Sequence, residues 1–119
     1  PDAVPLYEAL EKRILSEIEN VSIRVQKTQI TFTNPKVFAC VSNLRVRRKS
    51  EMPEVYIVVT FGLGYHKESP RIAAATEAHP NRWTHHVAVS SLEEIDEELM
   101  DWIKEAAEFS ASKGRRKNG

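Results

Sequence analysis

The chain has 119 residues, of which 41% are hydrophobic and 29% charged, so it is long enough for one domain with its own core. Its formal net charge is zero, which argues against a dedicated nucleic-acid binder. No apolar run reaches the roughly 20 residues of a membrane helix, and the single cysteine, Cys40, excludes an internal disulfide. We therefore expect a soluble, cytoplasmic protein without a secretory signal or membrane partner.

The first predicted element is an amphipathic helix over residues 4–19. Its apolar positions recur at helical spacing: Tyr7, Leu10, Ile14 and Ile18. From Val21 the hydrophobic period changes to two, which predicts a two-stranded hairpin that ends near Thr33. Residues 37–46 and 55–61 predict two more strands, because they are rich in β-branched and aromatic residues.

The segment from residue 62 to residue 81 is ambiguous, since residues 72–76 suit either one or two helical turns or an extended crossing. Residues 83–89 then predict another strand. Ser91 and Glu94 form a capping box that opens the last helix. The expected buried stripe of this helix is Leu92, Ile95, Leu99, Trp102, Ala106 and Phe109. We expect one domain over residues 1–111 and a basic, disordered tail over residues 112–119.

Strands that cluster between two terminal helices indicate an α+β fold. We expect a mostly antiparallel sheet of about five strands, with the N- and C-terminal helices packed on one face. Strand parity then assigns a set of polar side chains to the opposite face, here called the open face: Arg24, Gln26, Gln29, Thr31, Tyr56, Thr60, Thr84 and His86. His85 has the other parity, so it faces the core or its edge.

The charges are sorted along the chain, because residues 20–50 contain no acid whereas residues 93–108 are strongly acidic. Two solvated faces that attract each other within the fold would explain this sorting, and so would an anionic partner. We predict no metal site, since no cysteine or aspartate stands at ligand spacing from the histidines. No carboxylate pair or nucleophile motif is evident, so we predict no catalytic residue and no cofactor.

Several short segments stand in order along the chain: Gln26-Lys27-Thr28-Gln29-Ile30, Val37-Phe38-Ala39-Cys40-Val41, Ser69-Pro70-Arg71-Ile72, Arg82-Trp83-Thr84-His85-His86-Val87 and Ile95-Asp96-Glu97-Glu98-Leu99. Together they resemble a bacterial family of domains of unknown function, some relatives of which are labelled predicted transport proteins. The resemblance implies a small α+β domain, used alone or fused to other modules. It places the family's lysine, arginine and histidine positions at Lys27, Arg71 and His86, with His85 as the alternative. The Cys/His segment that precedes the domain in some relatives is not matched here, so no zinc site is implied.

We expect a non-catalytic domain that binds an anionic or polar ligand on the open face through charge-assisted hydrogen bonds. The expected ligand-binding residues are Lys27, Tyr56, Arg71, Arg82 and His86. One alternative is a nucleic-acid-associated module that uses the basic segment 45–49 and the tail. A second alternative is a small enzyme with His86 as general base. A homodimer that pairs basic with acidic regions also fits the charge sorting.

Overall fold

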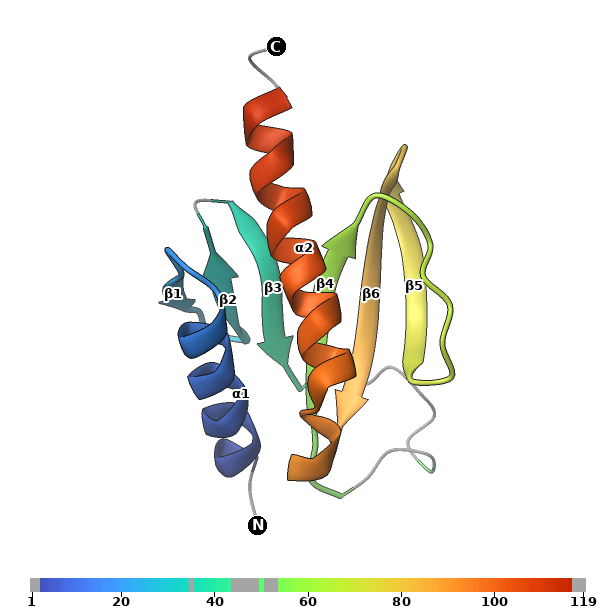
Figure 1. Cartoon of the computed structure of the whole chain (residues 1–119). Helices are drawn as coiled ribbons and strands as arrows, with labels where there is room; N and C mark the ends of the chain where they lie inside the picture. Colours follow the sequence, from blue (N-terminus) through green and yellow to red (C-terminus); the bar gives the residue numbers. More distant parts are fainter. Residues whose placement is uncertain (1–2, 35, 44–49, 51–53, 117–119) are drawn as a thin grey trace.

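The computed structural model describes residues 3–34, 36–43, 50 and 54–116, with the backbone alone for residues 113–116. It is an α+β fold in which two helices cover one six-stranded antiparallel sheet (Figure 1). The helices are α1 (Val4–Glu17) and α2 (Glu97–Arg116), and a short 3-10 turn, η2 (Leu92–Glu94), precedes α2. The strands are β1 (Ser22–Val25), β2 (Gln29–Thr33), β3 (Val37–Ser42), β4 (Ile57–Leu63), β5 (Ile72–His79) and β6 (Arg82–Val89). Their spatial order is β1-β2-β3-β4-β6-β5.

This architecture confirms the predicted fold class, with six strands where about five were expected. The additional strand is β5, which lies in the segment that the sequence left ambiguous. It forms a hairpin with β6, and Asn81 takes the left-handed conformation that the tight turn requires (φ 65). The Asn81 backbone N–H donates to the Glu77 carboxylate at 3.1 Å, which holds the turn closed. Pairing with β6 therefore overrides the helical preference of the alanine run.

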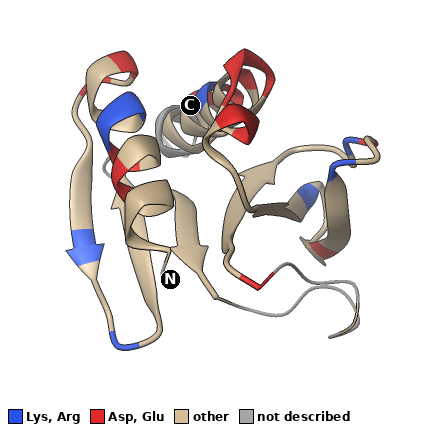
Figure 2. Cartoon of the chain, turned by 90° about the horizontal axis from the view of Figure 1, so that it is seen from below, with Lys and Arg blue, Asp and Glu red and all other residues tan. Residues whose placement is uncertain are grey.

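Both helices lie on the same face of the sheet, and their apolar sides form the core with it (Figures 1 and 2). In α1, Tyr7 stacks on Phe32 of β2 at 6.4 Å between ring centroids. In α2, Trp102 lies 6.0 Å from Phe61 of β4. Within the described residues, no helix combines the length and the apolar character that a membrane crossing requires.

The α2 helix begins later than the capping box predicts. The carboxylate of Glu94 accepts hydrogen bonds from the Ser90 and Ser91 N–H groups at 2.7 and 3.1 Å, but this box opens η2. Asp96 caps α2 itself, because its Oδ1 accepts the Leu99 N–H at 3.0 Å. Leu92 is consequently 57% exposed, so the prediction that it belongs to the buried stripe was wrong. The helix continues to Arg116, past residue 111, where we expected the ordered domain to end.

Candidate functional site

A row of four side chains crosses the open face on neighbouring strands. Thr31 of β2 pairs with Cys40 of β3, Cys40 pairs with Thr60 of β4, and Thr60 pairs with His86 of β6. Each of these residues alternates with residues whose side chains point to the helices, so the sheet register alone brings the four together. The sequence placed Thr31, Thr60 and His86 on this face. It missed Cys40, because β3 is so apolar that its two faces could not be separated by hydrophobicity.

The centre of the row is the contact between Thr60 and His86. The Thr60 Oγ1 lies 2.8 Å from the His86 Nδ1. Burial lowers the pKa of His86, so the imidazole is neutral at pH 7. When the Thr60 hydroxyl donates to Nδ1, the proton of the neutral ring is on Nε2, which becomes a hydrogen-bond donor. Burial raises the pKa of the Cys40 thiol, although the neighbouring Thr60 hydroxyl acts in the opposite direction, so Cys40 is not a ready thiolate.

The middle of the open face is more buried than a simple solvated face would be. Thr31 is 5% exposed and Val58 of β4 is 0% exposed, although both have the parity of the open face. The row therefore lies in partly desolvated surroundings, which explains the directions of the two pKa shifts.

The strand residues described on the open face include no aspartate or glutamate. Two arginines lie on the same face: Arg24 of the edge strand β1 pairs with Thr31 at one end of the row, and Arg82 lies at the start of β6, four residues from His86. Acidic side chains instead gather on the two helices, as the red segments of Figure 2 show. The charge sorting of the sequence thus becomes a sorting between an acidic helical layer and an acid-free sheet face.

The structure distributes the five expected ligand-binding residues over separate places. Arg82 and His86 share one face of β6, four residues and about 13 Å apart along the strand. Lys27 lies in the exposed β1–β2 turn. Tyr56 precedes β4, where its hydroxyl donates to the Asn43 carbonyl at 3.0 Å. Asn43 Nδ2 donates in return to the Tyr56 carbonyl at 2.9 Å, so this pair ties the end of β3 to the start of β4.

Arg71 lies on the helical side of the sheet, away from His86. Its Nη1 contacts Asp96 Oδ1 at 2.9 Å and Glu98 Oε1 at 3.0 Å, and its Nη2 donates to the Glu94 carbonyl at 2.6 Å. The guanidinium also lies 5.7 Å from the centroid of the Trp102 ring. Arg71 therefore joins the β4–β5 connection to the start of α2, and it lies apart from the expected ligand-binding residues Arg82 and His86 on the open face.

His85 is fully buried on the helical side, as its parity predicted. Its ring stacks on Phe61 at 5.1 Å, and its Nε2 accepts the Lys67 N–H at 3.0 Å. The proton of the neutral ring is therefore on Nδ1. Burial lowers the pKa of His85, while hydrogen bonding to the backbone of Phe61 acts in the opposite direction. These contacts make His85 a core residue.

No observation favours the two alternative functions. Burial lowers the pKa of His86, and within the described part of the chain the side chain that contacts its ring nitrogen is Thr60 and not a carboxylate that could orient a general base. The described part of the chain contains no group of three or more potential metal ligands. The basic segment 45–49 of the nucleic-acid alternative lies outside the described residues.

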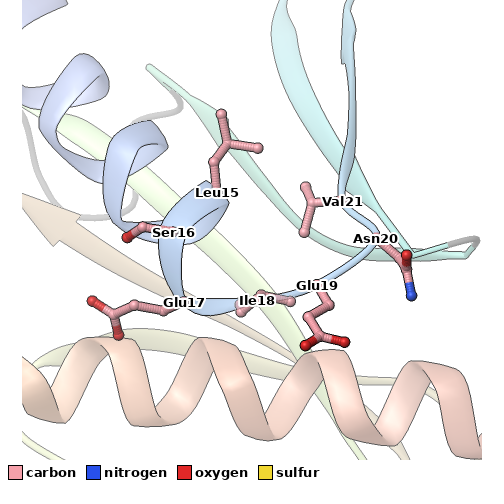
Figure 3. A pocket seen from close by; sticks show the side chains of 7 residues that line it. All are labelled: Leu15, Ser16, Glu17, Ile18, Glu19, Asn20 and Val21. Carbon is pink, nitrogen blue, oxygen red and sulfur yellow. The ribbon is translucent and has the colours of Figure 1, made fainter.

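One surface hollow lies at the turn between α1 and β1 and is lined by residues 15–21 (Figure 3). The carboxylate of Glu17, one of the lining residues, already forms ion pairs with Arg13 at 2.7 Å and with Lys104 at 2.8 Å. The pair with Arg13 lies within α1, and the pair with Lys104 ties the end of α1 to α2. The hollow is therefore part of the helix–helix packing, and we do not assign a ligand to it.

Comparison with curated proteins gave no match, and neither did comparison with solved structures. A family model does match residues 1–110, which is nearly the whole chain, under the description "Domain of unknown function (DUF5655)". This match supports the expected resemblance to a family of domains of unknown function. The chain belongs to the domain-of-unknown-function family DUF5655.

Proposed function

We propose that this domain binds an anionic or polar ligand on the open face, centred on Thr60 and His86. The observation that carries the proposal is the partly buried, acid-free row in which these two side chains are hydrogen-bonded at 2.8 Å. In the tautomer in which the Thr60 hydroxyl donates to Nδ1, a ligand there meets the Nε2 donor of an oriented imidazole, and the described strand residues of this face offer no competing carboxylate. The proposal concerns binding and includes no chemical step.

The expected contact is a hydrogen bond from the His86 Nε2 to an oxygen of the ligand. Thr60 fixes the imidazole orientation through Nδ1, so little rotational freedom is lost when the ligand binds. Arg82 and Arg24 add a favourable electrostatic field at the two flanks of the row. Because an anion next to His86 stabilises the imidazolium form, binding raises the pKa of this histidine from its lowered value.

The test is a titration followed by NMR of the uniformly labelled domain with phosphate, small carboxylates, nucleotides and short single-stranded oligonucleotides. We expect saturable shifts on β4 and β6, together with an upward shift of the His86 pKa. His86→Gln and Thr60→Val should each weaken binding about tenfold, which corresponds to one charge-assisted hydrogen bond.

The matched control is His66→Gln, because His66 is an exposed histidine that stacks on Trp83 at 4.7 Å, on the other side of the sheet. This variant should bind as the wild type does. Shifts that map to other elements, or equal binding by His86→Gln and the wild type, would refute the assignment. Oligonucleotide binding that weakens steeply with salt and is independent of His86 would favour the nucleic-acid alternative.

A further inference from the structure

A second hollow lies on the helical side, between the first turns of α1 and the β1–β2 turn. Its volume is about 870 Å³, which is within the usual range of small-molecule sites. Its lining includes the apolar or aromatic side chains of Tyr7, Ile30, Val41 and Ile57. Val41 and Ile57 are core residues, 5% and 3% exposed, so the groove is an opening at the end of the hydrophobic core.

The rim of this groove exposes unusual apolar surface. Val25 at the end of β1 is 76% exposed and Val4 at the start of α1 is 54% exposed, and both line the groove. Apolar side chains that border an apolar opening together form the kind of exposed patch that marks a binding surface. An apolar ligand would remove this surface from water.

The described residues that line the groove carry charge of one sign only, which is positive. Among the described residues that line it, Lys27 is the only charged one. Lys27 makes no ion pair with another described residue. A cation on the rim of an apolar groove is complementary to a molecule with an apolar body and one anionic group.

Two sets of hydrogen bonds fix the walls. In the β1–β2 turn, the Gln26 N–H donates to the Gln29 carbonyl at 2.8 Å, and the Thr31 hydroxyl donates to the Gln26 side-chain oxygen at 2.7 Å. At the base of α1, the Tyr7 hydroxyl donates to Glu11 at 2.9 Å, which leaves its ring as the part that can meet a ligand. The backbone of the turn that carries Lys27 is therefore held in place next to the apolar floor.

We propose that this groove binds a small amphiphile that carries one carboxylate, with its apolar body against Tyr7 and Ile30 and its carboxylate at Lys27. The site is on the opposite side of the sheet from His86, so it is independent of the function proposed above. It also gives Lys27 a role that does not require contact with Arg82 or His86.

The experiment compares sodium decanoate, decanol and decyltrimethylammonium, all below their micelle concentrations, by NMR titration of the intact chain. We expect saturable binding of decanoate, with shifts in α1 and the β1–β2 turn, and binding about tenfold weaker for decanol. The cationic amphiphile should bind more weakly still. Lys27→Gln should reduce the affinity for decanoate to that for decanol and leave decanol binding unchanged.

A second variant tests the apolar part of the groove. Val25→Asp should weaken both decanoate and decanol at least tenfold. Val37→Asp is the matched control, since Val37 is a strand valine that is 59% exposed and does not line this groove. Non-saturable binding of decanoate, equal affinity for decanol and decanoate in the wild type, or decanoate binding that survives both Lys27→Gln and Val25→Asp would overturn the proposal. His86→Gln should leave decanoate binding unchanged, which separates this test from that of the open face.

Discussion

Replacement of Arg71 by alanine should lower the stability of the fold. The guanidinium contacts two carboxylates and one carbonyl around the start of α2, and its plane lies over Trp102. These contacts join a loop to a helix more than 20 residues further along the chain. Without them, the β4–β5 connection loses its polar attachment to α2, and the ring of Trp102 gains access to water.

The size of the effect follows from the exposure of the partners. Asp96 and Glu98 are 45% and 55% exposed, so each ion pair contributes about 0.5 kcal/mol, as surface pairs do. The hydrogen bond to the Glu94 carbonyl adds about 1 kcal/mol, and the contact with Trp102 adds about 0.5 kcal/mol. The sum of about 2.5 kcal/mol corresponds to a fall in Tm of roughly 10 °C for a domain of this size.

Thermal and urea denaturation followed by circular dichroism measure this loss. Arg71→Lys should recover less than half of it, because a lysine keeps the charge without the planar, bidentate geometry. Arg24→Ala is the control, since Arg24 is an exposed arginine on an edge strand, and it should change stability by less than about 0.5 kcal/mol. If Arg71→Ala melts within about 2 °C of the wild type, the attachment contributes little, and the case for Arg71 as a ligand-binding residue is restored.

Stability should also fall as the pH is lowered from 7 to 5, because burial lowers the pKa of both His85 and His86 in the folded protein. Below about pH 6.5 the unfolded chain binds protons that the folded protein does not, and His86→Gln should make this pH dependence of Tm shallower. Gly64→Ala should lower the free energy of unfolding, measured by urea denaturation, by about 1 kcal/mol, because the added Cβ would lie 2.9 Å from the Phe109 ring. Gly62→Ala is its matched partner and should have the opposite sign, since its Cβ would meet nothing closer than 3.9 Å. Equal effects of the two glycine variants, or a Tm that is constant over this pH range, would contradict these expectations.

The period-two alternation carried most of the fold information in this sequence. It correctly assigned His85 to the core and His86 to the open face, because adjacent strand residues must point to opposite sides. The segment that became β5 has no such signal, since its alanines suit a helix or a strand. Its structure depends on pairing with β6, which is a tertiary contact that no local pattern records.

The surroundings of the expected binding residues could not be read from the sequence in the way that the helices and strands could. Arg71 contacts Asp96, and Tyr56 contacts Asn43. Both contacts depend on how the loops fold back on the sheet. A sequence pattern shows that an arginine is present, but it does not show whether the fold already supplies a carboxylate to it. The contact of each expected residue with a ligand stays a prediction, and for Arg71 it now competes with a defined structural role.

The strongest reason to look for a ligand on the open face is that its polar side chains are less exposed to solvent than those of an ordinary solvated sheet face. A solvated antiparallel face would keep its polar groups wet and its central valine exposed. Here Val58 and Thr31 are buried, and burial shifts the pKa of both Cys40 and His86 toward their neutral forms. Partial desolvation of polar groups carries an energetic cost that the Thr60–His86 hydrogen bond offsets only in part. A ligand that accepts a hydrogen bond from the His86 Nε2 would add a hydrogen bond in these partly desolvated surroundings, so we expect the open face to gain more from binding a polar molecule than an ordinary solvated sheet face does.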